Sequence, residues 1–337
     1  MKKYLLPENG TFYKANLHCH TTCSDGKLTP EETKAAYKAH GYSVVAFTDH
    51  NVMYNHSYLN DESFIALMGC EADITEKGSE PYNNRKVIHF NYISLKPENT
   101  APFFFGSSLG YVEKNAEKFP KETEFYKNEP ICKLGYVPAN ISYLFEKARE
   151  KGYFVTYNHP GWSREEYPQY INYNNMNALE IFNYASFHEG HEGYTPTVYD
   201  DMLRAGKRIY CIAADDNHNT VTDAFGGFTM IKAEKLEYET ITDALVKGHF
   251  YASMGPEIKS LVFEDGKIKI ECSEAERICI TTGQRRAASV WASDGKSVTY
   301  AEFDVYPNDR YVRLTVTDHR GRSANTSGYF INELLCD

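Results

Sequence analysis

The chain has 337 residues, of which 42% are hydrophobic, a length of about two domains with enough apolar residues to bury a full core. Asp and Glu number 46 against 36 Lys and Arg, and the resulting net charge of -10 argues against sequence-independent binding of DNA or RNA by a basic surface. The 8 cysteines form no C-x-x-C pair, so the sequence suggests neither a cysteine zinc finger nor a disulfide framework, and reduced thiols fit best.

The first ten residues, MKKYLLPENG, are not typical of a signal peptide. Their apolar run covers only residues 4–6 before Pro7 breaks it, which is too short for a signal-peptide core. No later stretch approaches the length of a membrane span. Together with the reduced thiols, these features predict a cytoplasmic protein that does not interact with membranes.

Strand-like and helix-like stretches then alternate along the chain. TPEETKAAYKAHG (29–41) has a Thr N-cap, Pro at the first helical position, Glu in the first turn and a closing Gly, which predicts a helix. The β-branched and aromatic residues of YSVVAFTDH predict a buried strand. Further strands are expected in FIALMGCEAD, KVIHFNYIS, YFVTYNHP, ALEIFN and RIYCIAADDNH, and further helices in ISYLFEKAREKG and TVYDDMLRAGK. Repeated βα units predict an α/β fold with a parallel sheet closed as a barrel.

Two regions depart from this alternation. Residues 95–138 are aromatic and loop-like, with a helix expected in YVEKNAEKF, and we interpret them as an insertion that covers one end of the barrel. After residue 256, short alternating runs separated by turn residues predict a small all-β domain without helices. The expected organisation is a barrel domain over residues 1–256 and an all-β domain over residues 257–337.

Side chains that can bind metal cluster at the C-terminal ends of the predicted strands. His18 and His20 are spaced i, i+2, so in a strand their imidazoles point to one face and can meet at one ion. By itself such a pair is more often two half-buried histidines satisfied by backbone carbonyls. The other members of the set are His50, Glu71, His89, His159, Asp216 and His218. Barrel enzymes build their active sites on this face, so the convergence predicts a metal site.

The motifs LHCHTTCSDG, FTDHN, GCE, IHFN, NHPGW and DDNH, in this order over residues 12–255, resemble those of the PHP (polymerase and histidinol phosphatase) metallohydrolases. The resemblance implies an irregular (β/α)7 barrel with up to three metal ions. The stretch GHFYASMGP, followed by a β domain, is similar to the subgroup that carries a C-terminal β extension.

The resemblance also implies a ligand set divided over three ions. One ion would be held by His18, His20, Glu71 and Asp216, a second, bridged by Glu71, by His89 and His159, and a third by Asp25, His50 and His218. Asp25 stands where some family members have His. Imidazole and carboxylate ligands without thiolate suit zinc, manganese or iron.

The implied reaction is hydrolysis by a hydroxide that bridges two metals, while the third ion polarises a phosphoryl oxygen. Glu71 and Asp216 would act as the catalytic carboxylates that hold these ions. Arg164, in HPGWSREE, is the candidate clamp for a phosphate group, with a surface salt bridge as the alternative role.

Four further residues lie beside the ligands in the sequence, two cysteines and two aspartates. Cys19 and Cys23 lack a partner base and are interpreted as packing residues. Asp49 and Asp215 either orient a ligand imidazole or serve as solvated or helix-capping carboxylates.

The expected function is that of a metal-dependent phosphoesterase acting on a small phosphorylated metabolite or nucleotide. One alternative is hydrolysis of a non-phosphate ester or amide by the same cluster. Another is a non-catalytic, metal-stabilised binding module, against which the complete ligand set argues. Specificity would reside in the insertion at residues 95–138 and in loops.

Overall fold

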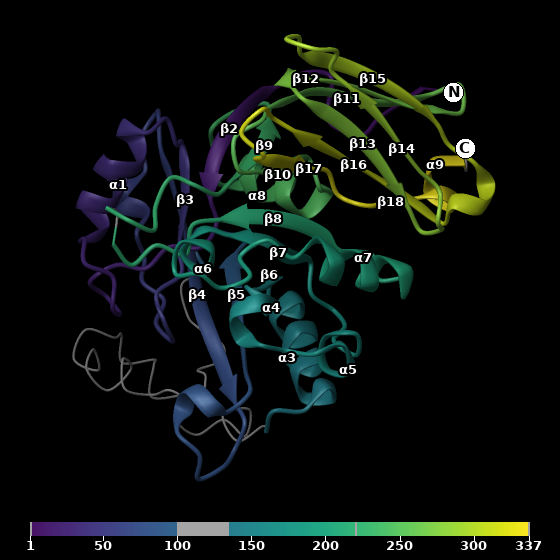
Figure 1. Ribbon diagram of the computed structural model, residues 1–337. Coiled ribbons are helices and arrows are strands. Elements are labelled where there is room, and N and C mark those ends of the chain that lie inside the picture. The colour runs from purple at the N-terminus through teal and green to yellow at the C-terminus, as the bar shows by residue number, and fades with distance from the viewer. Residues whose placement is uncertain (1, 100–134, 220, 336–337) are drawn as a thin grey trace.

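The structure is a computed structural model that describes residues 2–99, 135–219 and 221–335. Figure 1 shows a mixed α/β part, in which helices lie around the strands, and a β-rich part that holds the C-terminus. The expected helix in YVEKNAEKF and most of the insertion at residues 95–138 lie outside the described residues.

Seven strands of the α/β part follow one another across the sheet in chain order. They are β2 (Thr11–Asn16), β3 (Val44–Phe47), β4 (Ile65–Thr75), β5 (Val87–Ser94), β6 (Tyr153–Tyr157), β7 (Ala178–Asn183) and β8 (Tyr210–Ala214). The pairs β2–β3, β3–β4, β6–β7 and β7–β8 are parallel. Every strand expected from the sequence of this part is present.

The sequence predicts a wholly parallel sheet. This prediction is wrong at β5, which runs antiparallel to both β4 and β6. The segment between β4 and β5 contains only a short 3-10 helix, η2 (Tyr82–Asn84), and no crossover helix. A connection without a crossover joins antiparallel strands, whereas a parallel pair needs a long one. The fold is therefore mixed α/β, and the regular (β/α)7 barrel stays a prediction.

The first and last strands of this series meet just beyond their carboxyl ends. The backbone nitrogen of Asp216 donates to the carbonyl of His18 at 2.9 Å, and that of His20 donates to the carbonyl of Asn217 at 3.1 Å. Cys19 and Asn217 form an isolated parallel bridge. The chain segments that carry the expected ligands are thus fastened to one another through the backbone.

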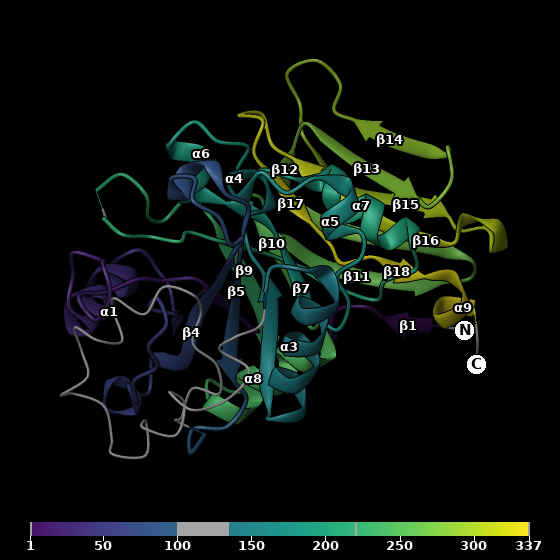
Figure 2. The same ribbon diagram turned by 90° about the horizontal axis from the view of Figure 1, so that it is seen from below.

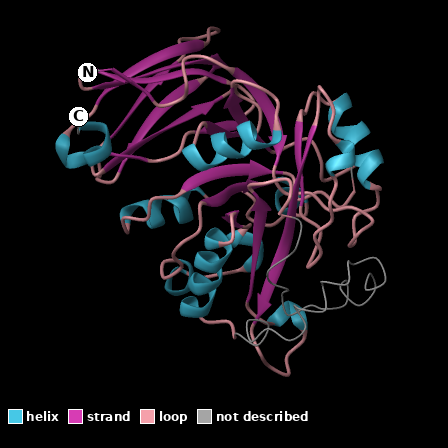
Figure 3. Ribbon diagram, turned by 180° about the vertical axis from the view of Figure 1, so that it is seen from behind, coloured by secondary structure: helices cyan, strands magenta, loops and turns pink. Residues whose placement is uncertain are grey.

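The predicted helix at residues 29–41 is confirmed as α1 (Pro30–Ala39). Its N-cap Thr29 accepts a hydrogen bond from the Glu32 nitrogen and donates its own nitrogen to the Glu32 carboxylate, which is a capping box. The other α-helices of this part are α3 (Pro138–Glu150), α4 (Pro160–Ser163), α5 (Tyr167–Tyr170), α6 (Tyr184–His188), α7 (Pro196–Arg204) and α8 (Tyr238–Lys247), and a 3-10 turn is η1 (Ser57–Leu59). Figure 3 shows these helices from behind. Over the described ranges, none of the helices has the length and apolar character needed to cross a membrane.

The β-rich part continues the same sheet. After β9 (Phe228–Ala233) and β10 (Phe250–Ser253), β10 pairs with a strand near the C-terminus, β17 (Ser323–Asn325). The remaining elements are β11 (Ile258–Glu264), β12 (Lys267–Ala275), β13 (Arg277–Thr282), β14 (Ala287–Trp291), β15 (Val298–Asp304), η6 (Pro307–Asp309), β16 (Tyr311–Thr317), β18 (Tyr329–Phe330) and α9 (Ile331–Leu335). The all-β expectation missed the 3-10 helix η6 and the short helix α9.

The domain boundary at residue 256 stays a prediction, and two features of the structure cross it. The first strand, β1 (Lys2–Tyr4), pairs with β11, so the N-terminus belongs to the second sheet, of order β1-β11-β12-β15. Leu6 and Tyr251 pack into the apolar core of the β-rich part. Figures 1 and 2 both show the N- and C-termini beside each other in this part.

Candidate metal centre

The nine side chains expected as ligands come together at one cavity of about 600 Å³. Seven of them line it, namely Asp25, His50, Glu71, His89, His159, Asp216 and His218. The other two, His18 and His20, are buried and contact Glu71 and Asp216. The expected gathering is therefore present, but Glu71 lies inside β4 and His89 inside β5 rather than at strand ends, because β4 continues past Glu71 to pair with the antiparallel β5.

The first group joins two histidines of the β2 extension to two carboxylates. The Nε2 atoms of His18 and His20 lie 3.2 Å apart. Each also lies close to the Oδ1 atom of Asp216, at 3.1 Å from His18 and 3.0 Å from His20. Glu71 completes the group, with its Oε1 3.1 Å from His18 Nε2 and its Oε2 3.4 Å from His20 Nε2.

Glu71 also faces a second set of imidazoles. Its Oε1 lies 3.3 Å from His89 Nδ1 and 3.2 Å from His159 Nε2. Its Oε2 lies 3.0 Å from His50 Nδ1. The carboxylate is thus in contact with several groups of nitrogen ligands, which is the placement that a bridging ligand requires.

The third group surrounds Asp25. Its Oδ2 lies 3.6 Å from His50 Nε2, and its Oδ1 lies 3.5 Å from His218 Nε2. His20 is a further member, with its Nδ1 3.8 Å from Asp25 Oδ1. Because its two ring nitrogens face different groups, His20 connects the third group to the first.

The chemistry of these donors fits divalent metal ions. Asp216 Oδ1 is buried and has no hydrogen-bond partner, although two imidazole nitrogens lie within ion-pair distance of it. Buried polar atoms in proteins are nearly always satisfied, and a cation between these atoms would satisfy all of them. The set contains only imidazole and carboxylate, as zinc, manganese and iron prefer.

The electrostatics of the cluster also favour a cation at its centre. Burial alone would lower the pKa of His20, but Asp216 and Glu71 outweigh burial and raise that pKa to about 10. Burial would raise the pKa of Glu71, but His18, His89 and His50 hold it well below its usual range. The carboxylates therefore attract positive charge into the cluster, and metal ions that replace the imidazole protons supply it.

Glu180 is a member of the site that the sequence analysis missed. It lies within β7, is 1% exposed, and accepts hydrogen bonds from His18 Nδ1 at 3.1 Å and from the His159 backbone nitrogen at 3.0 Å. A hydrogen bond to Nδ1 fixes the ring so that Nε2 faces the cluster. The only signal in the sequence was a charged residue inside the apolar run ALEIFN.

Asp49 and Asp215 anchor loops, a role that neither interpretation from the sequence included. Asp49 is 2% exposed and accepts hydrogen bonds from both the backbone and the hydroxyl of Thr21 and of Ser24. Asp215 is fully buried, and it accepts backbone hydrogen bonds from residues 225–227 and one from the Tyr37 hydroxyl. Burial raises the pKa of Asp215 to about 6.

The structure does not bring Arg164 to the cavity. This residue is exposed, follows α4 with a φ of 56°, and is not among the residues that line the cavity. Among the described residues, the cavity lining contains no Lys or Arg. Besides the ligands, the lining residues are Asn51, Asp73, Tyr82, Trp162, Ala185, Ser186 and Glu189.

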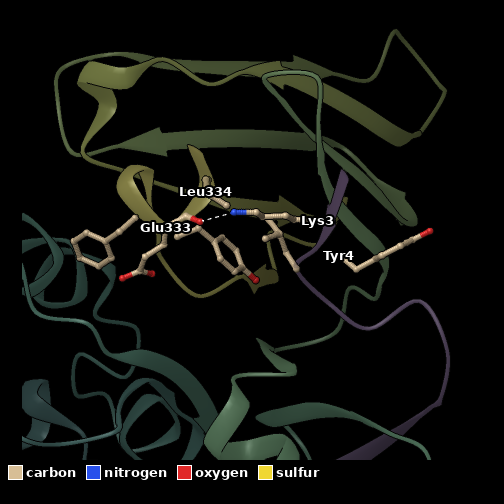
Figure 4. A pocket seen from close by; sticks show the side chains of 7 residues that line it. Lys3, Tyr4, Glu333 and Leu334 are labelled. Atoms are coloured by element: carbon tan, nitrogen blue, oxygen red, sulfur yellow. Dashed lines mark hydrogen bonds between the residues drawn. The ribbon is translucent and has the colours of Figure 1, made fainter. Parts of the chain in front are cut away.

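A cavity of about 430 Å³ lies elsewhere, between β1, β18 and α9 (Figure 4). Lys3 crosses it and donates from Nζ to the carbonyl of Glu333. Its lining offers a single carboxylate and no imidazole. This cavity therefore lacks the donor set that marks the cluster.

The chain is similar to a family model and to several solved structures. A family model described as the PHP domain matches residues 16–247. No match is found among curated proteins. Among solved structures, a two-domain protein from Bacteroides vulgatus that contains a predicted PHP-like metal-dependent phosphoesterase is 16% identical, with 96% of this chain and 98% of that chain covered and a TM-score of 0.45. An amidohydrolase from Chromobacterium violaceum is 16% identical, with 62% and 89% covered and a TM-score of 0.36.

Proposed function

The chain belongs to the PHP domain family, and from this premise we propose that it is a metal-dependent phosphoesterase of small phosphorylated metabolites or nucleotides. The observation that carries the proposal is the convergence of six imidazoles and three carboxylates at one cavity. Such a set is costly to bury without cations, because each charged or polar group loses its hydration. The cluster is therefore best explained as a site built around metal ions.

In this proposal the ligands divide over two or three ions of zinc, manganese or iron. His18, His20, Glu71 and Asp216 would hold the first, Glu71, His89 and His159 the second, and Asp25, His50 and His218 the third, where His20 is also close. When bound, such ions lower the pKa of a coordinated water and offset the charge of a phosphoryl group.

The surrounding residues position the ligands and shape the substrate site. Glu180 orients His18, and the two oxygens of Glu71 hold separate groups of imidazoles at fixed distances. Trp162 forms part of the wall, with its ring 5.1 Å from the rings of His89 and His159. A volume of about 600 Å³ suits a small metabolite or a nucleotide.

The same geometry supports a second candidate, the hydrolysis of a non-phosphate ester or amide. Among the described residues, no Lys or Arg lines the cavity, while Asp73 and Glu189 do. Recognition of a phosphate would therefore depend on the metal ions, because nearby carboxylates repel an anion. A binding module without catalysis is the third reading, and activity measurements separate it from the other two.

The test combines elemental analysis with a substrate panel. Purified protein is assayed with manganese on phosphomonoesters, nucleotides and aryl esters, before and after chelation. We expect turnover of a phosphomonoester or nucleotide that chelation abolishes and added metal restores. Full activity of metal-free protein contradicts metal dependence, turnover of aryl esters alone supports the second candidate, and inactivity of metal-loaded protein on every class supports a binding module.

A further inference from the structure

Beside the main cluster lies another group of side chains that can bind metal, and it shares no member with that cluster. Its members are Cys23, Asp49 and His56, whose ligand atoms lie within 4.8 Å of one another. Cys23 comes from the segment between β2 and α1, and the other two come from the segment between β3 and β4. The group therefore joins two loops that are far apart in the sequence.

His56 is the most informative member of this group. Its side chain is 4% exposed, and its Nδ1 is buried without a hydrogen-bond partner. An unsatisfied buried polar atom costs about 1–3 kcal/mol, so a partner is expected at this position. Burial lowers the pKa of His56 despite the nearby Asp49 carboxylate, which keeps the imidazole neutral, the form that binds metals.

Asp49 is held in place by hydrogen bonds that its two carboxylate oxygens accept. Its Oδ1 accepts hydrogen bonds from the Thr21 nitrogen at 2.7 Å and from the nitrogen and hydroxyl of Ser24 at 3.1 and 2.8 Å. Its Oδ2 accepts one, from the Thr21 hydroxyl at 2.8 Å. Among the described hydrogen bonds, Oδ2 therefore has fewer donors than Oδ1, and a carboxylate oxygen has about two lone-pair sites.

We propose that Cys23, Asp49 and His56 form a separate binding site for one zinc-like transition-metal ion, with the Cys23 thiolate as a ligand. Thiolate, imidazole and carboxylate together suit zinc, and they differ from the sulfur-free main cluster. Cys23 releases its thiol proton to solvent on binding. Cys23 is half-buried, and a water molecule from solvent would be the fourth ligand in this proposal. If it holds, this site would replace the interpretation of Cys23 as a packing residue.

The site has a structural consequence for the main cluster. The loops that it joins also carry Asp25 and His50, two of the ligands proposed for the third ion. A metal ion held between these loops would restrict their relative movement and so fix the distance between the two ligands. The inference nevertheless stands independently of the proposed function, because it concerns other side chains and has its own readout.

Cobalt substitution tests the proposal, because thiolate bound to Co²⁺ gives a near-ultraviolet charge-transfer band that nitrogen and oxygen ligands do not. The full-length protein is stripped with a chelator and titrated with Co²⁺. We expect the band in the wild type, its loss in Cys23→Ser with about one bound ion fewer per chain, and its weakening in His56→Ala. The matched control is Cys279→Ser, a half-buried cysteine on β13, which should keep the band.

Two results would overturn the proposal: a wild type without the band at saturating Co²⁺, or a band that survives in Cys23→Ser. Cys23→Ser changes a single atom, so it decides the question even if His56→Ala fails to fold. Glu71→Gln should keep the band, since the main cluster contains no sulfur ligand. Loss of activity in that variant therefore tests the main cluster, while the band tests the Cys23 site.

Discussion

The α/β part and the β-rich part bury their strands in different ways. β3 and β5 are buried along their whole length, whereas β13 alternates strictly between buried and partly exposed residues. A sheet covered on both faces has no outer face for polar side chains, so those inside its strands, such as Glu71 of β4 and His89 of β5, must find partners within the fold. A strand with one solvated face spreads them along its length instead. The first arrangement concentrates polar side chains at one place, and the candidate metal centre lies there.

The two parts also differ in how a buried charge is balanced. Where they meet, Arg313 of β16 is 4% exposed and donates two hydrogen bonds of 2.7 Å to Asp200 of α7. In the candidate metal centre, the residues that contact the three carboxylates include imidazoles but no Lys or Arg among the described ion pairs. Two of these carboxylates, Glu71 and Asp216, are buried, and the absence of a Lys or Arg among their described partners indicates that cations come from outside.

The largest expected effect is that of Glu71→Gln. The amide keeps the shape of the side chain but removes the charge that offsets two neighbouring ions, and its nitrogen cannot ligate as a carboxylate oxygen does. We expect metal content to fall and kcat to drop about a thousandfold or more. Both quantities are measured on one preparation, with circular dichroism to confirm the fold. Glu271→Gln, on an exposed position of β12, is the matched control, and wild-type values for Glu71→Gln would remove that residue from the site.

Breaking the ion pair between Arg313 and Asp200, which joins the two parts, should lower stability without changing metal binding. Arg313→Met leaves the mostly buried Asp200 without its cation, so the free energy of unfolding should fall by about 3–5 kcal/mol. Arg204→Met breaks an exposed pair with Asp201 and should cost at most about 1 kcal/mol. Urea unfolding measures both, and metal content per folded chain should not change. Equal losses in the two variants would show that burial does not set the strength of the pair.

The carboxyl group of Glu165, in the α/β part, is expected to make the free energy of unfolding depend on pH. It is 8% exposed, accepts hydrogen bonds from Tyr136, Tyr157 and Tyr173, and burial raises its pKa from 4.5 to about 7. The folded state therefore binds the proton more tightly than the unfolded state does. Its contribution to stability is fully present below pH 4.5, is lost as the pH rises to about 7, and amounts to roughly 3 kcal/mol.

The measurement is urea unfolding of metal-free protein between pH 4.5 and 8, so that loss of metal does not contribute. In Glu165→Gln the fall in stability should be smaller by roughly 3 kcal/mol, whereas Glu146→Gln, an exposed position on α3, should keep the whole fall. A fall of the same size in the Glu165 variant would assign the pH dependence to other groups, such as Asp215.

The smallest effect is expected for Arg164→Ala. Because Arg164 is exposed and does not line the cavity, kcat/KM for a phosphate ester should change less than about twofold. Trp162→Ala, which removes part of the cavity wall, should lower kcat/KM more. A tenfold rise in KM for Arg164→Ala with phosphate esters, but not with neutral esters, would restore the phosphate clamp inferred from the sequence.

Local features of the sequence determined much of this structure. The capping box at Thr29 fixes the start of α1, because its hydrogen bonds join residues only three apart. The buried strands were evident from runs of β-branched and aromatic residues, and the histidines that follow them marked the end of the sheet where the cluster lies. These features need only short-range geometry and the tendency of strand ends to gather polar side chains.

Tertiary structure alone decided what depends on residues far apart in the chain. Lys2 pairs with Glu264, which places the N-terminus in the second sheet, and β5 reverses direction between its neighbours. Glu180 orients His18 from a different strand, and Cys23 meets His56 from another loop. Such contacts depend on pairing, register and the path of loops, which are set by the packing of the whole chain and leave little trace in local residue patterns.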